Sequence, residues 1–168
     1  MFRCGVRVFW RPRKVMTLTS FIELGLSEKL VASLEQMNYT TPTPIQEKAI
    51  PLLLQGRDLM GLAQTGTGKT AAFGLPMIEL LSKKGSKPAN RTTRALVLAP
   101  TRELVNQIGE NLRAYVRKTH LKINQVVGGA SINKQQLQLE KGTDILVATP
   151  GRLLDLIARN AISLASVE

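Results

Sequence analysis

Cysteine and histidine are nearly absent from this sequence of 168 residues, in which Cys4 and His120 are the only ones. One cysteine cannot close an intramolecular disulfide. One residue of each kind also gives little support for a cysteine-rich zinc site or a Cys-His nucleophile pair. The simplest interpretation is a protein of a reducing compartment, and we therefore expect a cytoplasmic location.

Long hydrophobic runs are also missing. No apolar stretch approaches the roughly 20 residues that a membrane-spanning helix needs, and the first residues lack the sustained apolar stretch of a secretory signal. Hydrophobic residues make up 43% of the sequence and aromatic residues only 4%, with a mean hydropathy of −0.01. These values are typical of an ordinary soluble α/β protein. A chain of this length has room for one domain with one core.

Acidic residues are few, at 12 against 23 Lys and Arg, so the formal net charge is +11. A basic surface attracts phosphate backbones and releases their counterions, which indicates a polyanionic partner. Part of this charge lies in residues 1–15, which hold five bases and no acid, so that +6 remains for residues 16–168. We treat residues 1–15 as a basic tail. It is a disordered tail or a mis-assigned start ahead of Met16, an RNA-binding tail, or an Arg-rich organelle presequence.

Strand and helix signals alternate along residues 16–168. Ser27 is a candidate N-cap for a helix with apolar residues from Leu30 to Met37, and Thr43-Pro44 opens a second helix that Pro51 kinks or divides. Farther on we expect strands at 58–63, 95–99, 123–127 and 145–148, and helices at 69–81, 102–118, 132–139 and 152–159. Apolar strands between helices indicate an α/β fold with a parallel sheet and helices on both faces.

The sequence AQTGTGKT, residues 63–70, lies between an expected strand and an expected helix, where a phosphate-binding loop belongs. Glycines let successive backbone N–H groups point at phosphate oxygens, and the helix N-terminus adds partial positive charge. Lys69 would reach the β- and γ-phosphates of ATP, and the Thr70 hydroxyl would ligate Mg²⁺. The nucleotide contacts expected here are Gln64, Thr65, Gly66, Thr67, Gly68, Lys69 and Thr70. The alternative is a glycine turn with a chance lysine.

This loop has Ala63 where the general pattern has glycine, and so resembles motif I of superfamily 2 helicases. Upstream, NYTTPTPIQ at residues 38–46 resembles the Q motif of DEAD-box proteins, with Asn38 in place of the family's usual glycine. Asn also tolerates left-handed backbone geometry, so this change is mild. Thr40 and Thr41 replace positions that are often charged in the family.

The resemblance to the DEAD-box family implies contacts to adenine. Phe21 lies seventeen residues before Asn38, where the family has an aromatic. Phe21 and Tyr39 would pack around the base, and Gln46 would hydrogen-bond its exchangeable edge, because an amide offers a donor beside an acceptor. From the residues alone, Thr43-x-x-Gln46 is also a capping box, in which Gln46 only satisfies an N–H at the helix end.

Three further segments resemble the family's RNA-contacting motifs: PTREL at 100–104, the glycine pair at 128–129 and TPGRL at 149–153. Each follows an expected strand, at the edge where open α/β sheets bind ligands. Hydroxyls, arginines and glycines suit a sugar-phosphate backbone, so RNA binding would be independent of base sequence. Singly, these segments are also common turn sequences. The RNA contacts expected are Pro100, Thr101, Arg102, Gly128, Gly129, Thr149, Pro150, Gly151 and Arg152.

The resemblance covers Phe21 to Glu168 and implies an incomplete first RecA-like P-loop domain of an ATP-dependent RNA helicase, most similar to the bacterial RhlE type. The family's next motif, Asp-Glu-Ala-Asp, does not occur in the sequence. Its first Asp would hold Mg²⁺ and its Glu would position the attacking water. The second RecA-like domain is missing as well. Without the strand that carries the motif, apolar faces and unpaired backbone groups would be exposed.

For these 168 residues we therefore expect weak binding of ATP and RNA without hydrolysis. One alternative is a truncated, non-catalytic binding module that competes with an intact helicase. Another is a P-loop ATPase outside RNA metabolism, such as a DNA helicase, although the Q motif beside PTREL and TPGRL argues against it.

Overall fold

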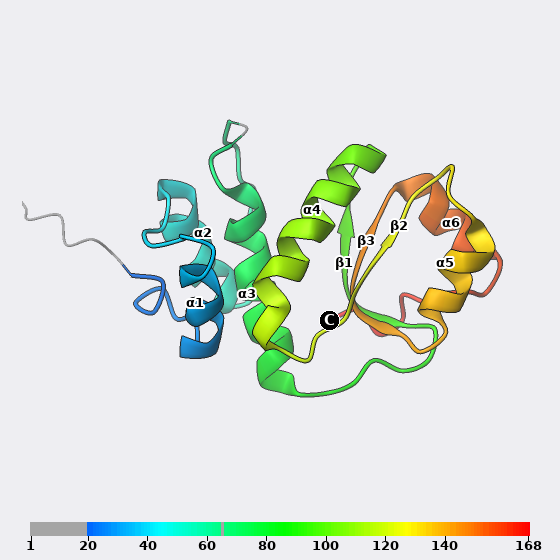
Figure 1. Cartoon of the computed structure of the whole chain (residues 1–168), viewed down its shortest axis with the longest axis horizontal. Coiled ribbons are helices and arrows are strands. Elements are labelled where there is room, and N and C mark those ends of the chain that lie inside the picture. Colours follow the sequence, from blue (N-terminus) through cyan, green and yellow to red (C-terminus); the bar gives the residue numbers. More distant parts are fainter. Residues whose placement is uncertain (1–19, 65) are drawn as a thin grey trace, which may run out of the picture.

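The structure is a computed structural model that describes residues 20–64 and 66–168 (Figure 1). It confirms an α/β fold. Three helices precede the first strand: α1 (Glu28–Glu35), α2 (Pro44–Leu54) and α3 (Lys69–Lys84). The remaining elements are β1 (Thr93–Leu98), α4 (Arg102–Tyr115), the 3-10 helix η1 (Val116–Lys118), β2 (Ile123–Val126), α5 (Ile132–Leu139), β3 (Thr143–Ala148) and α6 (Pro150–Ala158). None of the helices in the described residues is long and apolar enough to span a bilayer.

The sheet is parallel, with the strand order β1-β3-β2. Every residue of the central strand β3 is buried, because helices cover both faces of the sheet. Ile145 and Val147 face a core formed with α1 to α4, whereas Leu146 and Ala148 face a second core formed with α5 and α6. Figure 1 shows these two layers of helices on opposite sides of the strands.

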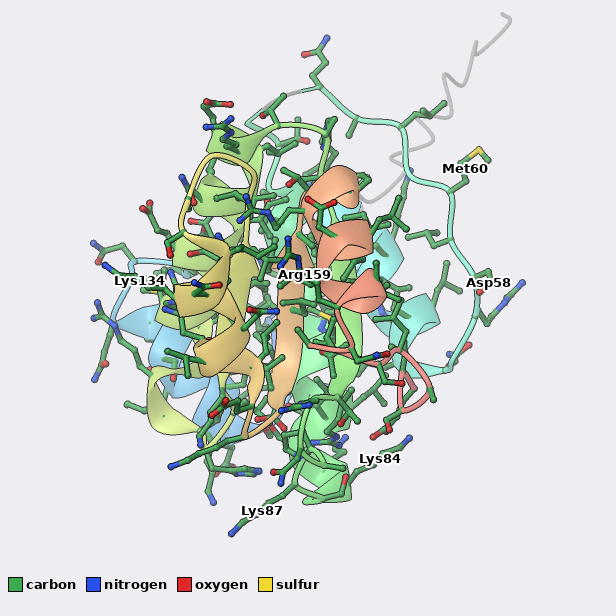
Figure 2. The ribbon with its side chains drawn as sticks, turned by 90° about the vertical axis from the view of Figure 1, so that its right-hand side faces the viewer. Asp58, Met60, Lys84, Lys87, Lys134 and Arg159 are labelled. Carbon is green, nitrogen blue, oxygen red and sulfur yellow. The ribbon has the colours of Figure 1, made fainter. Side chains whose placement is uncertain are left out.

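The strand expected at residues 58–63 is wrong. These residues have no regular structure, and Met60 and Leu62 are 90% and 92% exposed. Figure 2 shows that this loop, with Asp58 and Met60, lies at the periphery of the protein. An apolar run forms a strand only beside a partner that pairs its backbone groups, and no described strand lies next to this one.

Pro51 does not divide the second helix, which runs without interruption from Pro44 to Leu54. Proline lacks only its own N–H, and in the last turn of a helix this removes a single backbone bond. Ser27 precedes α1 as expected, but its hydroxyl does not cap the helix. It donates instead to a carboxylate oxygen of Glu79 at 2.7 Å, which ties α1 to α3.

The outer edge of β1 carries a buried ion cluster at its amino end. Arg94, 3% exposed, donates to Asp144 at 3.1 Å and to Glu168 at 2.9 Å. Burial alone would lower the pKa of Arg94, but the hydrogen bonds to Glu168 and Asp144 outweigh it and raise the pKa. The backbone N–H of Glu168 also donates to the Arg94 carbonyl at 2.8 Å. Beyond this contact, a groove of about 540 Å³ follows β1 toward Leu98.

Candidate nucleotide and RNA site

The phosphate-binding loop leads directly into α3, a helix of 16 residues that begins at Lys69. Gly66 and Gly68 have φ values of +82° and +84°, in the left-handed region that favours glycine. A Cβ atom at Gly66 would meet nothing within 4 Å, so the backbone is open to an approaching phosphate. The ammonium of Lys69 donates to the carbonyl of Ala63 within the same loop. Thr65 lies outside the described residues.

The Q motif contacts this loop through Gln46, which is only 1% exposed. Its Oε1 accepts from the Thr43 backbone N–H at 3.0 Å, and its Nε2 donates to the Gly68 carbonyl at 3.2 Å. The Thr43 hydroxyl donates to the Thr67 carbonyl at 2.9 Å. Gln46 therefore caps α2 and also holds the phosphate-binding loop, so the helix-cap interpretation is correct as far as it goes. Its contact to adenine stays a prediction.

The two aromatics expected around adenine lie in the core that α1 to α4 share. Phe21 is 2% exposed, and Tyr39 is partly buried. The Tyr39 ring meets Tyr115 of α4 edge to face, with centroids 6.1 Å apart and hydroxyl oxygens 3.5 Å apart. Burial, and then the hydrogen bond to Tyr39, raises the pKa of Tyr115. Asn38 has φ +59°, which confirms the left-handed backbone at this position.

The three segments expected to contact RNA meet at the carboxyl ends of the strands. Arg102 follows β1 and lies against the turn after β2, since a Cβ atom at Gly129 would come within 2.2 Å of its Nη1. Gly129 has φ +77°. Arg152 follows β3 and donates from Nη1 to the Ala130 carbonyl at 2.9 Å. Both arginines thus lie against the same glycine turn, and a hydrogen bond holds Arg152 there.

The remaining residues of these segments begin the two following helices. Pro100 is exposed, and Thr101 caps α4 by accepting from the Leu104 N–H at 3.2 Å. Pro150 and Gly151 form the exposed first turn of α6. The Thr149 hydroxyl makes no cap bond to that helix. No atom lies within 4 Å of a Cβ built at Gly128 or Gly151, so both backbones are accessible.

Two residues of this site were missed from the sequence. Gln135 of α5 is 5% exposed, and its Nε2 donates to the Val127 carbonyl at 3.0 Å, directly before the glycine pair. No feature of the sequence distinguishes Gln135 from the polar residues beside it. The sequence indicates Thr43 only as a helix cap, but its hydroxyl also donates to the phosphate-binding loop. The hydroxyl gave no signal of that second contact.

The site offers one hydroxyl, that of Thr70, as the expected ligand of a metal ion at the head of α3. Within the described part of the chain, no three His, Cys, Asp or Glu side chains come together as a metal site. The glycines and the helix N-terminus suit a phosphate group, which would itself bring oxygens to a bound Mg²⁺.

Comparison with known proteins adds the family. The family model described as DEAD/DEAH box helicase matches residues 43–168. The ATP-dependent RNA helicase CshA of Listeria monocytogenes is 48% identical over 151 residues, which cover 90% of this chain and 28% of that protein. The RNA helicase CrhR of Synechocystis sp. is 46% identical over 153 residues, which cover 90% of this chain and 30% of that protein. The chain thus spans less than a third of the length of these curated relatives.

Solved structures agree with this result. The helicase Prp28 from Chaetomium thermophilum, bound to ADP, matches with a TM-score of 0.80 at 42% identity, over 88% of this chain and 36% of that one. A DEAD box protein from Methanococcus jannaschii matches with a TM-score of 0.78 at 37% identity, over 89% of this chain and 39% of that one. The RecA-like fold class is therefore confirmed, whereas similarity to the RhlE type stays a prediction. The chain belongs to the DEAD-box family of helicases.

Proposed function

We propose that this chain is part of an ATP-dependent RNA helicase that couples ATP binding and hydrolysis to local unwinding of RNA duplexes. The observation that carries the proposal is the bridge from Gln46 and Thr43 to the phosphate-binding loop. It joins the motif that is specific to DEAD-box proteins to the loop that would hold the phosphates. A cytoplasmic location fits the single cysteine.

ATP would bind at the head of α3. The loop N–H groups and Lys69 would contact its phosphates, and Thr70 would contribute to Mg²⁺ binding. When bound, Mg²⁺ neutralises charge on the β- and γ-phosphate oxygens. Lys69 would have to leave the Ala63 carbonyl, its partner in this structure, to reach a phosphate. Gln46 would keep the loop beside the Q motif during this change.

RNA would bind across the carboxyl ends of the three strands. Arg102 and Arg152 would contact phosphate oxygens, and the open backbone at Gly128 and Gly151 would allow close approach of the sugar-phosphate chain. The contacts involve no base edges, so affinity would be nearly the same for different base sequences.

For the 168-residue chain by itself we propose binding without turnover. The Asp-Glu-Ala-Asp motif, which the family resemblance implies would hold Mg²⁺ and position the attacking water, does not occur in these 168 residues. The second candidate is a non-catalytic module that competes with an intact helicase. It is favoured by the same lack of the Asp-Glu-Ala-Asp motif.

Equilibrium binding of a fluorescent ATP analogue, with and without Mg²⁺, tests the nucleotide site. Lys69→Ala should weaken binding at least about tenfold, on the scale of one lost charge-assisted contact. Lys87→Ala, an exposed lysine elsewhere, should leave binding unchanged. Equal binding by all three proteins contradicts the nucleotide site. The proposed absence of turnover is contradicted if RNA stimulates phosphate release by the 168-residue chain and Lys69→Ala abolishes that release.

A further inference from the structure

A basic surface lies at the amino ends of the strands, opposite the carboxyl ends that carry Arg102 and Arg152. We call it the amino-end surface. It borders two hollows of about 570 Å³ and 390 Å³, which are lined by consecutive parts of the segment 118–124. Its basic residues, all exposed, are Lys29, Arg113, Lys118, His120, Lys122 and Lys141; Lys83 also lines the larger hollow but is paired with Glu79.

Acidic side chains do not neutralise this surface. Among the residues that the structure describes, Glu79 is the only acidic one that lines either hollow, and it is 1% exposed. Its carboxylate accepts from the Ser27 N–H and hydroxyl and pairs with Lys83 at 3.3 Å. In the described part of the chain, no side-chain nitrogen of the five Lys and Arg of the amino-end surface lies within 4.0 Å of a carboxylate, although the Lys122 backbone N–H donates to Asp144 at 2.8 Å.

Stabilisation of helix ends explains only part of this charge. Lys118 ends η1, and its ammonium donates to the Ala32 carbonyl in the last turn of α1 at 3.3 Å. Arg113 lies in the last turn of α4. At both places a cation complements the partial negative charge of the last carbonyls. Lys29, in contrast, lies in the first turn of α1, where a cation is unfavourable. Lys141 directly follows Glu140, the C-cap of α5, where a cation is also favourable, whereas Lys122 lies just before β2 and follows no helix end. The surface therefore has more positive charge than the fold requires.

The hollows also offer neutral hydrogen-bonding groups. Ser82 lines the larger one, and its Oγ is buried without a hydrogen-bond partner. Asn124 and Gln138 line the smaller one, beside the outer edge of β2. Charged ammonium groups beside amides and hydroxyls match the oxygens of a phosphate group more closely than they match an apolar ligand.

We propose that the amino-end surface is a second RNA contact, which binds backbone phosphates of a strand that extends beyond the carboxyl-end site. This inference rests on the proposed function, because it assumes that the carboxyl ends bind RNA. Lys122 and Gly128 flank β2 at its two ends. At about 3.3 Å per residue they are about 20 Å apart, which is about six nucleotides of a stacked strand at about 3.4 Å each. The amino-end surface therefore lengthens the RNA that the chain can hold.

The test compares short and long single-stranded RNA. Fluorescence anisotropy would measure binding of a short oligouridine of about six nucleotides, which only matches the distance between the two surfaces, and of a long one of about twenty nucleotides, which exceeds it. The variant Lys29→Gln/Lys118→Gln/Lys122→Gln removes three charges from the amino-end surface. Its matched control, Lys48→Gln/Arg57→Gln/Arg159→Gln, removes three charges from exposed positions elsewhere. Thermal unfolding would verify that both variants fold.

We expect the amino-end variant to bind the long RNA about tenfold more weakly than the control variant, the scale of three exposed ion contacts. Both variants should bind the short RNA equally. The slope of log affinity against log salt concentration should fall by about two for the long RNA, at about 0.7 for each lost contact. The inference is overturned if the two variants bind the long RNA equally. If, in that case, only the amino-end variant melts at a lower temperature, the charges of the amino-end surface serve to stabilise helix ends. Absence of RNA binding by the unmodified chain instead contradicts the proposed function.

Discussion

The side chain of Gln46 joins two helix starts, because its Nε2 donates to the Gly68 carbonyl at 3.2 Å while its Oε1 accepts from the Thr43 N–H at 3.0 Å. Both polar atoms of this amide are thus engaged while the Lys69 ammonium bonds to the Ala63 carbonyl. A base that took hydrogen bonds from Gln46 would compete with these two contacts. Binding of the base would then change the contacts that hold the phosphate-binding loop.

Gln46→Glu should separate these two contacts. A carboxylate can still accept from the Thr43 N–H, but it cannot donate to the Gly68 carbonyl, so two acceptors face each other in a buried place. We expect affinity for a fluorescent ATP analogue to fall about tenfold or more, on the scale of an unsatisfied buried group. Gln107→Glu adds the same charge at an exposed position and should have no effect. Unchanged affinity in both variants would exclude a role for the Gly68 contact.

Gly129→Ala should reduce RNA affinity. The new methyl would need a backbone with φ +77° and would come within 2.2 Å of Arg102 Nη1, so the arginine has to move. Gly85→Ala is the matched control, since Gly85 has φ +62° but nothing within 4 Å of the added atom. Both variants should lose about 1 kcal/mol of stability from backbone strain, but only Gly129→Ala should weaken RNA binding, measured by anisotropy. Similar loss of RNA binding in both would show that strain, not Arg102, is responsible.

Glu168→Gln should lower stability in a pH-dependent way. Hydrogen bonds from Lys84 and Arg94 lower the pKa of Glu168, so its contribution is present above the unfolded value of about 4.3. It is lost as the pH falls through the lower, folded value. At pH 7 we expect a loss of about 0.5 to 1 kcal/mol in chemical denaturation, because the side chain is 29% exposed. The difference from the unmodified chain should shrink below about pH 4.

Glu110→Gln, an exposed change in α4, is the control for this pH series and should show no such trend. A constant difference between Glu168→Gln and the unmodified chain from neutral to acid pH would disprove the ionic origin of the effect.

Leu98→Lys should reduce self-association of the chain. Leu98 is 54% exposed at the end of β1, on a sheet edge with no described neighbour and beside an apolar groove. Such edges pair with other chains, and lysine on the edge opposes this. Sedimentation velocity over a range of protein concentrations should show larger species for the unmodified chain than for the variant. Leu154→Lys changes a leucine on α6 that is 66% exposed and should behave like the unmodified chain.

The three described strands and the helices between them were predictable because each has a local signal. Apolar runs such as Ile145–Ala148 are buried on both faces, and Gly68-Lys69 marks the start of α3. The segment 58–63 carries the same apolar signal, but a strand also needs a neighbour, and no local pattern reveals whether one is present. The structure therefore departs from the sequence where pairing partners decide the outcome.

The site follows the same rule. The strand-end positions of Arg102 and Arg152 follow from order along the chain, whereas their common position against one glycine turn depends on contacts across the sheet. The Thr43 hydroxyl bonds to Thr67, 24 residues away in sequence, and no spacing rule anticipates that contact.

The central strand β3 has a consequence for the dynamics of the molecule. Ile145 and Val147 complete one core and Leu146 and Ala148 complete the other, so neither layer of helices can detach without exposing this strand. Its amide hydrogens should therefore exchange with solvent only when the whole domain opens, while the amides of the loop at 58–63 exchange without any such opening. The exchange rate of β3 then reports the global stability of the protein, and ligands that bind at either end of the strand should slow it together.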